Sequence, residues 1–261
     1  MTENEYAKIE RKFLLYYREF NENNRDIYIK YVHSFHVMFY MERLACKLSL
    51  SEDDIYLAKA IGLLHDIGRF EQLEKKNSYD DQLLDHADVA LNYLFTNNHI
   101  RKFIDNSEYD EIIKKAIFYH NKIEIGSDMT ERERLFAKMI RDMDKVDIYE
   151  QDAKFFRNSF FEKPTKKVVE DFLEGRLVSD KDSNNRSDFI IRYFGFLNDF
   201  NFAESLDILI ASDNFTKYVK SIKVSEDNKE LFEELVEECN KRLNKNDNKV
   251  NVKENNNGRI E

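Results

Sequence analysis

Apolar residues recur three and four positions apart along much of the chain, which is the spacing of one face of an α-helix. Between residues 26 and 48, for example, the apolar residues include Ile29, Val32, Val37, Phe39, Leu44 and Leu48. Up to residue 149, the pattern predicts helices over residues 26–48, 55–67, 85–95, 109–120 and 130–149.

The ends of these helices are marked by local signals. Ser51 is followed three residues later by Asp54, which resembles a capping box at the start of the second helix. Glycine is common just beyond a helix C-terminus, so we expect the second helix to end at Gly68. The polar segments 72–83 and 121–129 are expected to be loops, and loops of this length between helices often cover a site.

The character of the sequence changes beyond residue 150. Residues 150–243 could cap the site, or form a homodimer surface through the cluster of phenylalanines at residues 155–161. Helices are expected again at residues 184–201, 203–209, 214–222 and 227–243, followed by an Asn-, Lys- and Glu-rich tail that we expect to be disordered. The predicted organisation is a helical domain (1–150), a helical extension packing on it (151–243) and the tail (244–261).

Composition also favours a helical protein. The 261 residues include one proline and six glycines, which are too few for the turns of an all-β fold. Leu, Glu, Lys, Arg and Ala are abundant, and these residues lose little conformational freedom on entering a helix. A hydrophobic content of 42% is enough for a core. We therefore predict an all-α fold.

The chain is acidic, with a net charge of −10 and a pI near 5.3. This balance argues against general nucleic-acid binding and against an anionic membrane surface, because both need clustered positive charge. It does not exclude a small phosphorylated substrate, since bound metal ions could make a single pocket positive.

Nothing in the sequence indicates export or membrane insertion. Cys46 and Cys239 are far apart and form no CxxC motif, which argues against a disulfide framework and a zinc ribbon. The segment from Met1 to Arg11 is charged and lacks an apolar signal region. No apolar run approaches the ~20 residues that span a bilayer. We expect a soluble cytoplasmic protein.

One pair of polar residues interrupts an apolar segment. His65 and Asp66 follow Ile61-Gly62-Leu63-Leu64 and precede Ile67-Gly68. A buried aspartate is rare unless it is paired or bound to metal. A helix that ends nearby would let both side chains reach one ion or a bridged pair. Imidazole and carboxylate ligands suit six-coordinate Mn, Fe, Co, Ni or Zn better than a tetrahedral zinc finger.

The pair belongs to a longer series of motifs. They are KYVHSFHV (residues 30–37), IGLLHDIGRFEQ (61–72), DHA (85–87), YHNK (119–122) and RDMDKVD (141–147). In this order they resemble the HD-domain superfamily of metal-dependent phosphohydrolases over about residues 26 to 150. The resemblance implies an HD-domain-like helical bundle with a C-terminal helical extension.

The resemblance also implies a set of metal ligands. The primary ligands would be His33, His65, Asp66 and Asp144. His36 is a less favoured alternative to His33, because His33 fits the family spacing with a valine four residues on. Asp142 and Asp147 are alternatives to Asp144, but the register Asp-Lys-Val-Asp favours Asp144, which leaves them as solvated groups or as supports for the ligands.

Two further histidines favour a site with two ions over a site with one. His86 and His120 lie in the order seen in superfamily members that hold two metals, so we favour a two-metal site bridged by Asp66. In a one-metal site, they would instead bind substrate phosphate or transfer protons. The cofactor would be one or two divalent ions (Mn, Fe, Co, Ni, Mg or Zn). His99, in a polar stretch, is expected at the surface.

The implied reaction is phosphoester hydrolysis of a nucleotide or another small phosphorylated metabolite by a metal-activated water. Arg69 and Lys122 are candidate phosphate contacts, although Arg69 could equally be a cation at a helix C-terminus. The Gly-Tyr-Pro signature of the cyclic-dinucleotide phosphodiesterase branch is absent, so that substrate is not implied. Two alternatives are a di-iron oxygenase on the same scaffold and a non-catalytic metal-binding regulatory module.

Overall fold

The computed structural model describes the backbone of residues 1–256 and the side chains of residues 1–244. Its described residues are overwhelmingly helical, which confirms the predicted all-α class. The chain divides into two compact units, Met1–Asp147 and Ile148–Glu261. None of the described helices combines the length and the apolar character needed to cross a membrane.

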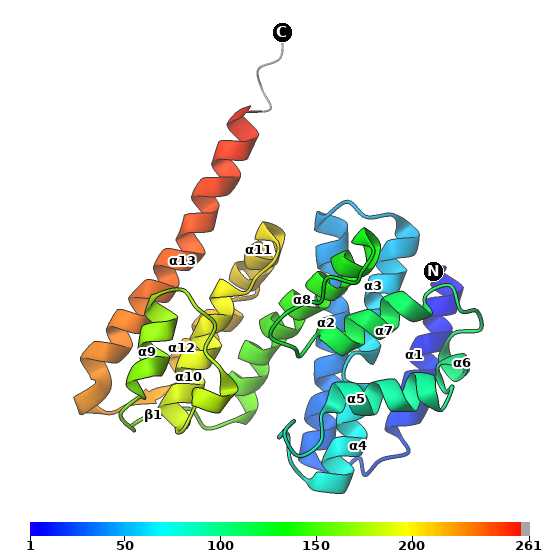
Figure 1. The fold of residues 1–261 in the computed structure, drawn as a ribbon, viewed down its shortest axis with the longest axis horizontal. Coiled ribbons are helices and arrows are strands. Elements are labelled where there is room, and N and C mark those ends of the chain that lie inside the picture. The colour runs from blue at the N-terminus through cyan, green and yellow to red at the C-terminus, as the bar shows by residue number, and fades with distance from the viewer. Residues whose placement is uncertain (257–261) are drawn as a thin grey trace. The chain divides into compact units, whose positions relative to one another are not determined.

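The first unit is a bundle in which helices distant in sequence pack side by side (Figure 1). Its elements are α1 (Glu3–Tyr17), α2 (Arg25–Lys47), α3 (Glu52–Leu64), α4 (Ile67–Lys76), α5 (His86–Leu91), the π-helical turn η1 (Asn92–Thr96), α6 (Ile100–Phe103), α7 (Asp110–Tyr119) and most of α8 (Glu131–Phe155). Helix α3 packs on both α1 and α2, and α5 packs on both α4 and α7. The candidate ligands lie on this set of helices.

Helix α1 was not predicted from the sequence. Its start is fixed by a capping box in which the Thr2 side chain accepts from the Glu5 backbone and Glu5 accepts in return. Its inner face carries Phe13 and Tyr16, which pack edge-on against Phe70 of α4 at centroid separations of 5.9 and 5.8 Å. This aromatic contact holds α1 against the start of α4.

The prediction that Gly68 ends a helix is wrong. Helix α3 ends at Leu64, His65 and Asp66 form the turn, and Gly68 lies inside α4. Glycine is required there because α4 packs closely on α5, and Gly68 does not have a left-handed backbone conformation. The segment from Gln72 to Lys76, expected to be a loop, is the second half of α4.

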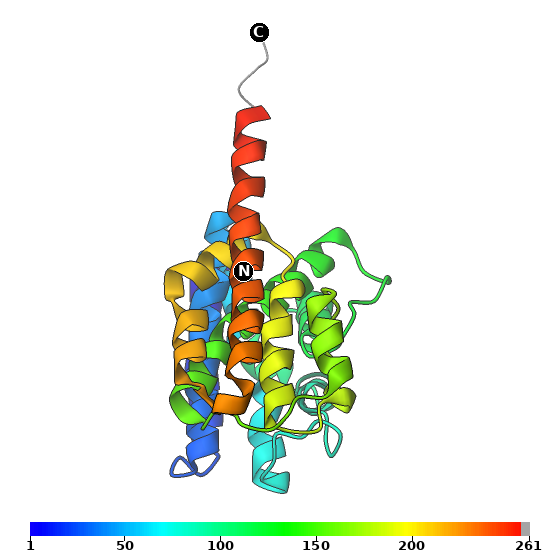
Figure 2. The same ribbon diagram turned by 90° about the vertical axis from the view of Figure 1, so that its left-hand side faces the viewer.

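The second unit also consists almost entirely of helices. Figure 2 shows its long helix α13 at the centre of the view, with shorter helices on either side. Its elements are β1 (Ser159–Phe160), α9 (Lys166–Leu173), η2 (Asp180–Asp182), α10 (Arg186–Gly195), η3 (Phe196–Asn198), α11 (Ala203–Ser212), α12 (Asn214–Ser221), β2 (Lys223–Val224), η4 (Glu226–Asn228) and α13 (Lys229–Asn256).

A short parallel contact between β1 and β2 anchors the phenylalanine-rich segment. Asn228 donates from its side-chain amide to the carbonyl oxygens of Phe161 and Glu162, at 3.0 and 3.1 Å. Phe160 is fully buried, whereas Phe161 is 55% exposed, so the predicted aromatic cluster is not one continuous surface. Helix α13 continues past residue 243 into the expected tail, and residues 257–261 of that tail lie outside the described part of the chain.

Candidate metal centre

The six residues proposed as ligands lie on different elements of the first unit. They are His33 on α2, His65 and Asp66 in the turn between α3 and α4, His86 at the start of α5, His120 directly after α7, and Asp144 on α8. All are buried except Asp144, whose side chain keeps 16% exposure. The fold therefore gathers residues from positions 33 to 144 at one point.

Two glycines allow the helices to approach closely enough for this. A Cβ atom added at Gly62 would lie 2.7 Å from the Cα atom of Met38, so this glycine lets α3 pack directly on α2. At Gly68 the added atom would lie 2.1 Å from the carbonyl oxygen of His86 and 2.6 Å from the backbone nitrogen of Ala90. Gly68 therefore lets the backbone of α4 contact that of α5, beside the metal centre.

The first group of donor atoms forms around His33. Its Nε2 atom lies 3.2 Å from Nε2 of His65 and 3.1 Å from Oδ1 of Asp144. Oδ2 of Asp66 is 3.4 Å from the same His33 atom and 3.7 Å from Nε2 of His65. Four side chains thus direct one donor atom each toward a common point.

A second group shares Asp66 with the first. Nε2 of His86 lies 2.8 Å from Nε2 of His120, and Oδ1 of Asp66 is 3.2 and 3.6 Å from these two nitrogens. Asp66 therefore directs Oδ2 toward one imidazole pair and Oδ1 toward the other. A carboxylate in this position can bridge two ions.

The outer nitrogen of each ring already has a partner. Nδ1 of His65 lies 2.8 Å from the carbonyl oxygen of Gly62, and Nδ1 of His120 lies beside that of Ile117. A carbonyl can only accept, so these Nδ1 atoms carry the proton and the neutral rings present a bare lone pair at Nε2. Lone pairs that face one another repel unless a cation lies between them.

These donors fit divalent metal ions. Nitrogen ligands lie roughly 2.0–2.1 Å from a transition-metal ion, so two ligands at right angles are about 3 Å apart. The separations of 3.2 and 2.8 Å between the facing imidazole nitrogens match this value. The mixed nitrogen and oxygen donor set suits Mn, Fe, Co, Ni or Zn. Three of the groups in the described chain that could hold a metal consist of these residues, and the other two are His36, Asp147 and Glu150, and Asp81, Asp85 and His86.

The ionised, buried carboxylates of the site also require a balancing positive charge. Burial opposes ionisation of Asp66, but Lys30, whose Nζ atom lies 2.7 Å from Oδ2, and the histidines outweigh it and hold the pKa of Asp66 well below its usual value. Burial and Lys30 lower the pKa of His33, yet hydrogen bonds with Asp144 and Asp147 raise it to about 10. A proton or a metal ion must balance these carboxylates, and metal binding displaces the proton.

Asp147 supports the first group from behind. Its two carboxylate oxygens accept from Nδ1 of His33 at 2.7 Å and from Nδ1 of His36 at 2.8 Å. His36 therefore lies outside the cluster, and His33 directs its free nitrogen into it. His99 is half-buried against Tyr93, 4.5 Å between ring centroids, and not on the open surface as expected.

Asp81 has the equivalent role in the second group, and sequence analysis did not identify it. Its Oδ1 atom accepts from Nδ1 of His86 at 2.7 Å. Arg69 donates to both oxygens of Asp81, at 2.8 and 3.2 Å, and to the carbonyl oxygen of Tyr79 at 3.0 Å. Burial raises the pKa of Asp81, but His86 and Arg69 outweigh it and lower the pKa overall. The only sequence signal for Asp81 was its acidic character in a predicted loop.

The second predicted phosphate contact is also paired with a carboxylate. Lys122 forms an ion pair with Oδ2 of Asp85, and Asn121 donates to Oδ1 of the same residue at 2.9 Å. Asp85 in turn caps α5 by accepting from the backbone of Ala87 at 2.9 Å. The loop after α7 is thereby held against the start of α5, where His86 lies.

A family model for the HD domain matches residues 31–182, which is more than half of the chain. The chain therefore belongs to the HD domain family, whose members are metal-dependent hydrolases. The matched range contains all six residues of the metal centre. A search of curated proteins and a search of solved structures gave no significant match.

Proposed function

We propose that this protein hydrolyses a phosphoester bond in a small phosphorylated substrate, such as a nucleotide, using two divalent ions bridged by Asp66. The observation that carries the proposal is the position of Asp66, which directs one oxygen toward His33 and His65 and the other toward His86 and His120. Two ions held this way are suited to in-line displacement at phosphorus.

The side chains of the centre have separable tasks. When bound, the ions supply a hydroxide formed from water near neutral pH and positive charge facing the phosphoryl oxygens. The imidazole pairs and Asp144 hold the ions, and Asp147 and Asp81 hold His33 and His86 in the tautomer that leaves Nε2 bare. Burial of these rings keeps bulk water from competing for the donor atoms.

Three cations near the centre are the candidates for contact with an anionic substrate. Lys30 is the nearest to the bridging carboxylate, and its side chain retains 15% exposure. In the proposal it neutralises phosphoryl oxygens once metal ions occupy the donor atoms of Asp66. Arg69 follows, with its Nε atom 3.8 Å from Oδ1 of Asp66, and it is also paired with Asp81, whereas Lys122 is paired with Asp85.

The test is metal analysis of the purified protein followed by assays with each metal added back. We expect close to two Mn or Fe ions per chain, and release of phosphate or a monoester from a panel of nucleotides, cyclic nucleotides and model phosphodiesters. The Asp66→Ala variant should lose both the metal and the activity. Full metal content in this variant would contradict the proposal.

The same preparations distinguish the two alternative functions. A di-iron oxygenase would require iron and consume oxygen, so an oxygen electrode with the iron-loaded protein provides the comparison. A metal-binding regulatory module would hold metal but leave every ester in the panel intact. Either result would replace the proposed hydrolysis.

A further inference from the structure

A groove on the first unit, away from the six metal-centre residues, carries an unusual concentration of positive charge. It has a volume of about 360 Å³ and is lined by α1, η1 and the segment around α6. Among the described residues that line it, the cationic side chains are Lys8, Lys12, Arg101 and Lys102, and Glu19 is the only acidic one. The whole chain has a net charge of −10, so this groove is locally opposite in sign.

Two of these cations are available to a ligand. Lys8 is paired with Asp105, and Arg101 with Asp110. In the described part of the chain, Lys12 and Lys102 have no carboxylate within ion-pair distance. Lys102 instead lies 5.9 Å from the centre of the Tyr93 ring. Two unpaired ammonium groups on opposite walls of a groove favour an anion between them.

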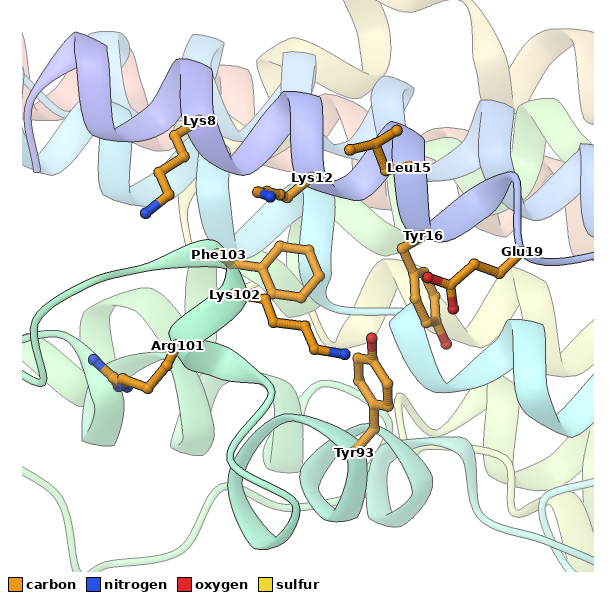
Figure 3. A pocket seen from close by; sticks show the side chains of 9 residues that line it. All are labelled: Lys8, Lys12, Leu15, Tyr16, Glu19, Tyr93, Arg101, Lys102 and Phe103. Carbon is orange, nitrogen blue, oxygen red and sulfur yellow. The ribbon is translucent and has the colours of Figure 1, made fainter.

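Aromatic residues close one end of the groove. In Figure 3, Tyr16 and Tyr93 stand at that end, and Phe103 lies between the lysines. The rings of Tyr16 and Tyr93 are 4.9 Å apart. The Tyr93 hydroxyl donates to no acceptor among the described residues, and burial raises its pKa to about 12, so it keeps its proton. The groove thus offers cations, a hydroxyl donor and aromatic surface within a volume typical of small-ligand sites.

Two residues of the groove are connected to segments that carry the candidate ligands. Tyr16 donates from its hydroxyl to the carbonyl oxygen of Ile67 at 3.1 Å, and Ile67 directly follows Asp66. Tyr93 lies on η1, the π-helical turn that extends α5, and α5 begins at His86. π-helical turns are rare and often occur at functional sites. A ligand that moved either tyrosine would therefore act on the backbone beside Asp66 or His86.

We propose that this groove is a second binding site, for a small phosphorylated organic anion, and that its occupancy changes the metal affinity of the centre through Tyr16. The ligand is placed with phosphoryl oxygens between Lys12 and Lys102 and an apolar or aromatic portion against Tyr93. Coupling of this kind is typically about 5- to 150-fold in affinity, and it is reciprocal.

Binding is tested first without metal. Isothermal titration of the full-length protein in a chelating buffer uses ADP and pyrophosphate as probes. We expect the Lys12→Gln/Lys102→Gln variant to bind ADP at least tenfold more weakly than the parent. The matched control is Lys114→Gln/Lys166→Gln, which removes the same charge at exposed lysines elsewhere. Absence of ADP binding to the parent, or equal binding by the groove variant, would overturn the site.

Coupling is tested separately by titrating Mn²⁺ with and without ADP at a saturating level. After subtraction of the Mn²⁺ that free ADP itself binds, the parent should show a shift of roughly fivefold or more in Mn²⁺ affinity, and Lys12→Gln/Lys102→Gln should not. Tyr16→Phe, which removes the hydrogen bond to Ile67 but keeps the ring, should retain ADP binding in chelating buffer and lose this shift. An unchanged shift in Tyr16→Phe would exclude the route through Tyr16. These binding measurements stand whether or not the metal centre hydrolyses a phosphoester.

Discussion

Histidine can donate or accept at either ring nitrogen, and in the metal centre the partner at Nδ1 decides which nitrogen faces inward. Carbonyl oxygens hold Nδ1 of His65 and His120, and carboxylates hold Nδ1 of His33 and His86. Each ring therefore presents Nε2 to the centre. Removing the group that accepts from Nδ1 of one histidine should weaken metal binding at the donor group of that histidine more than at the other donor group.

The two candidate first ligands give a direct test of this arrangement. His33→Ala should lose the ion of the first donor group, about half of the bound Mn²⁺, because its Nε2 atom is central to that group. His36→Ala should keep it, since Nδ1 of His36 lies 2.8 Å from Oδ1 of Asp147 and His36 is not among the residues whose donor atoms gather around Asp66. Metal content after gel filtration, compared with circular dichroism to verify folding, measures the difference. Equal losses in the two variants would contradict the assignment of His33.

Asp81 should matter for one half of the site only. Asp81→Ala removes the acceptor of His86 and should weaken Mn²⁺ binding at the second donor group about 10- to 100-fold. The ion held by His33 and His65 should bind nearly as in the parent. Asp80→Ala is the matched control, because this exposed neighbour caps only Gln82. Titration calorimetry that finds both ions weakened equally would show that Asp81 acts on the whole fold.

A titratable residue of the second unit should make stability depend on pH. Burial raises the pKa of Asp152 from 3.8 to about 6, against opposing effects of Arg186 and Asn158. Between about pH 4 and 6 the folded protein keeps this proton after the unfolded chain has lost it. The contribution of Asp152 to the free energy of unfolding therefore falls as pH rises, by about 3 kcal/mol in all. Asp152→Asn should therefore match the parent near pH 4 and exceed its stability at pH 8.

Urea unfolding of the parent and the variant at both pH values measures this contribution. Asp171→Asn is the contrasting control. Hydrogen bonds with Arg176 and Lys167 lower the pKa of Asp171, so its stabilisation is present above the ordinary carboxyl pKa and is lost in acid. The control should therefore be less stable than the parent at pH 8. A stability difference for Asp152→Asn that does not change with pH would rule out the proposed titration.

At the scale of elements, the contact between α4 and α5 determines whether Asp66 and His86 can meet. Gly68→Ala would press a methyl group into backbone atoms of His86 and Ala90, which cannot rotate away. We expect a loss of about 1–3 kcal/mol in unfolding free energy and weaker metal binding at the second donor group. Urea unfolding and Mn²⁺ titration measure the two effects.

Gly195→Ala is the control for this substitution. Gly195 is the last residue of α10, and the nearest side-chain atom to an added Cβ, from Val178, is 3.7 Å away. Alanine favours the helix here and should leave stability unchanged or slightly raised. If both glycine variants lost the same stability, close packing of α4 on α5 would not be the cause.

The sequence predicted the elements with strong periodicity better than those defined by contacts. The expected helix 26–48 differs from α2 by only one residue at its C-terminal end and one at its N-terminal end. Gly68 was misassigned because a glycine that ends a helix and one that admits a neighbouring helix look the same in sequence. Helix α1 was missed although its buried residues Tyr6, Ile9, Phe13, Tyr16 and Tyr17 follow helical spacing.

The candidate site shows the same division at the level of chemistry. The motifs named Asp66 and the five other candidate ligands that lie near it. They did not identify Asp81 or Lys30, whose roles depend on how a loop folds back and on which way a long side chain extends. They also gave no sign of the basic groove, because Lys12 and Lys102 line the same groove only once α1 packs on α6.

At the scale of the whole molecule, every candidate ligand belongs to the unit Met1–Asp147. A ligand that binds only the folded state stabilises it by about 2.7 kcal/mol at a free concentration 100 times its Kd. Metal should therefore stabilise the first unit directly. Elements of the second unit, such as α12, contain none of the donor atoms and should not respond to the same degree.

Hydrogen–deuterium exchange of the full chain with Mn²⁺ or with a chelator tests this distribution. We expect slower exchange with Mn²⁺ in the turn at His65 and Asp66, at the start of α5 and at the end of α7, because bound metal ties these segments together. Exchange in α12 should stay constant. The Asp66→Ala variant, which removes the carboxylate shared by both donor groups, should show no metal-dependent protection in these segments. Equal protection of α12 and the His65 turn in the parent would mean that the two units unfold as one cooperative body.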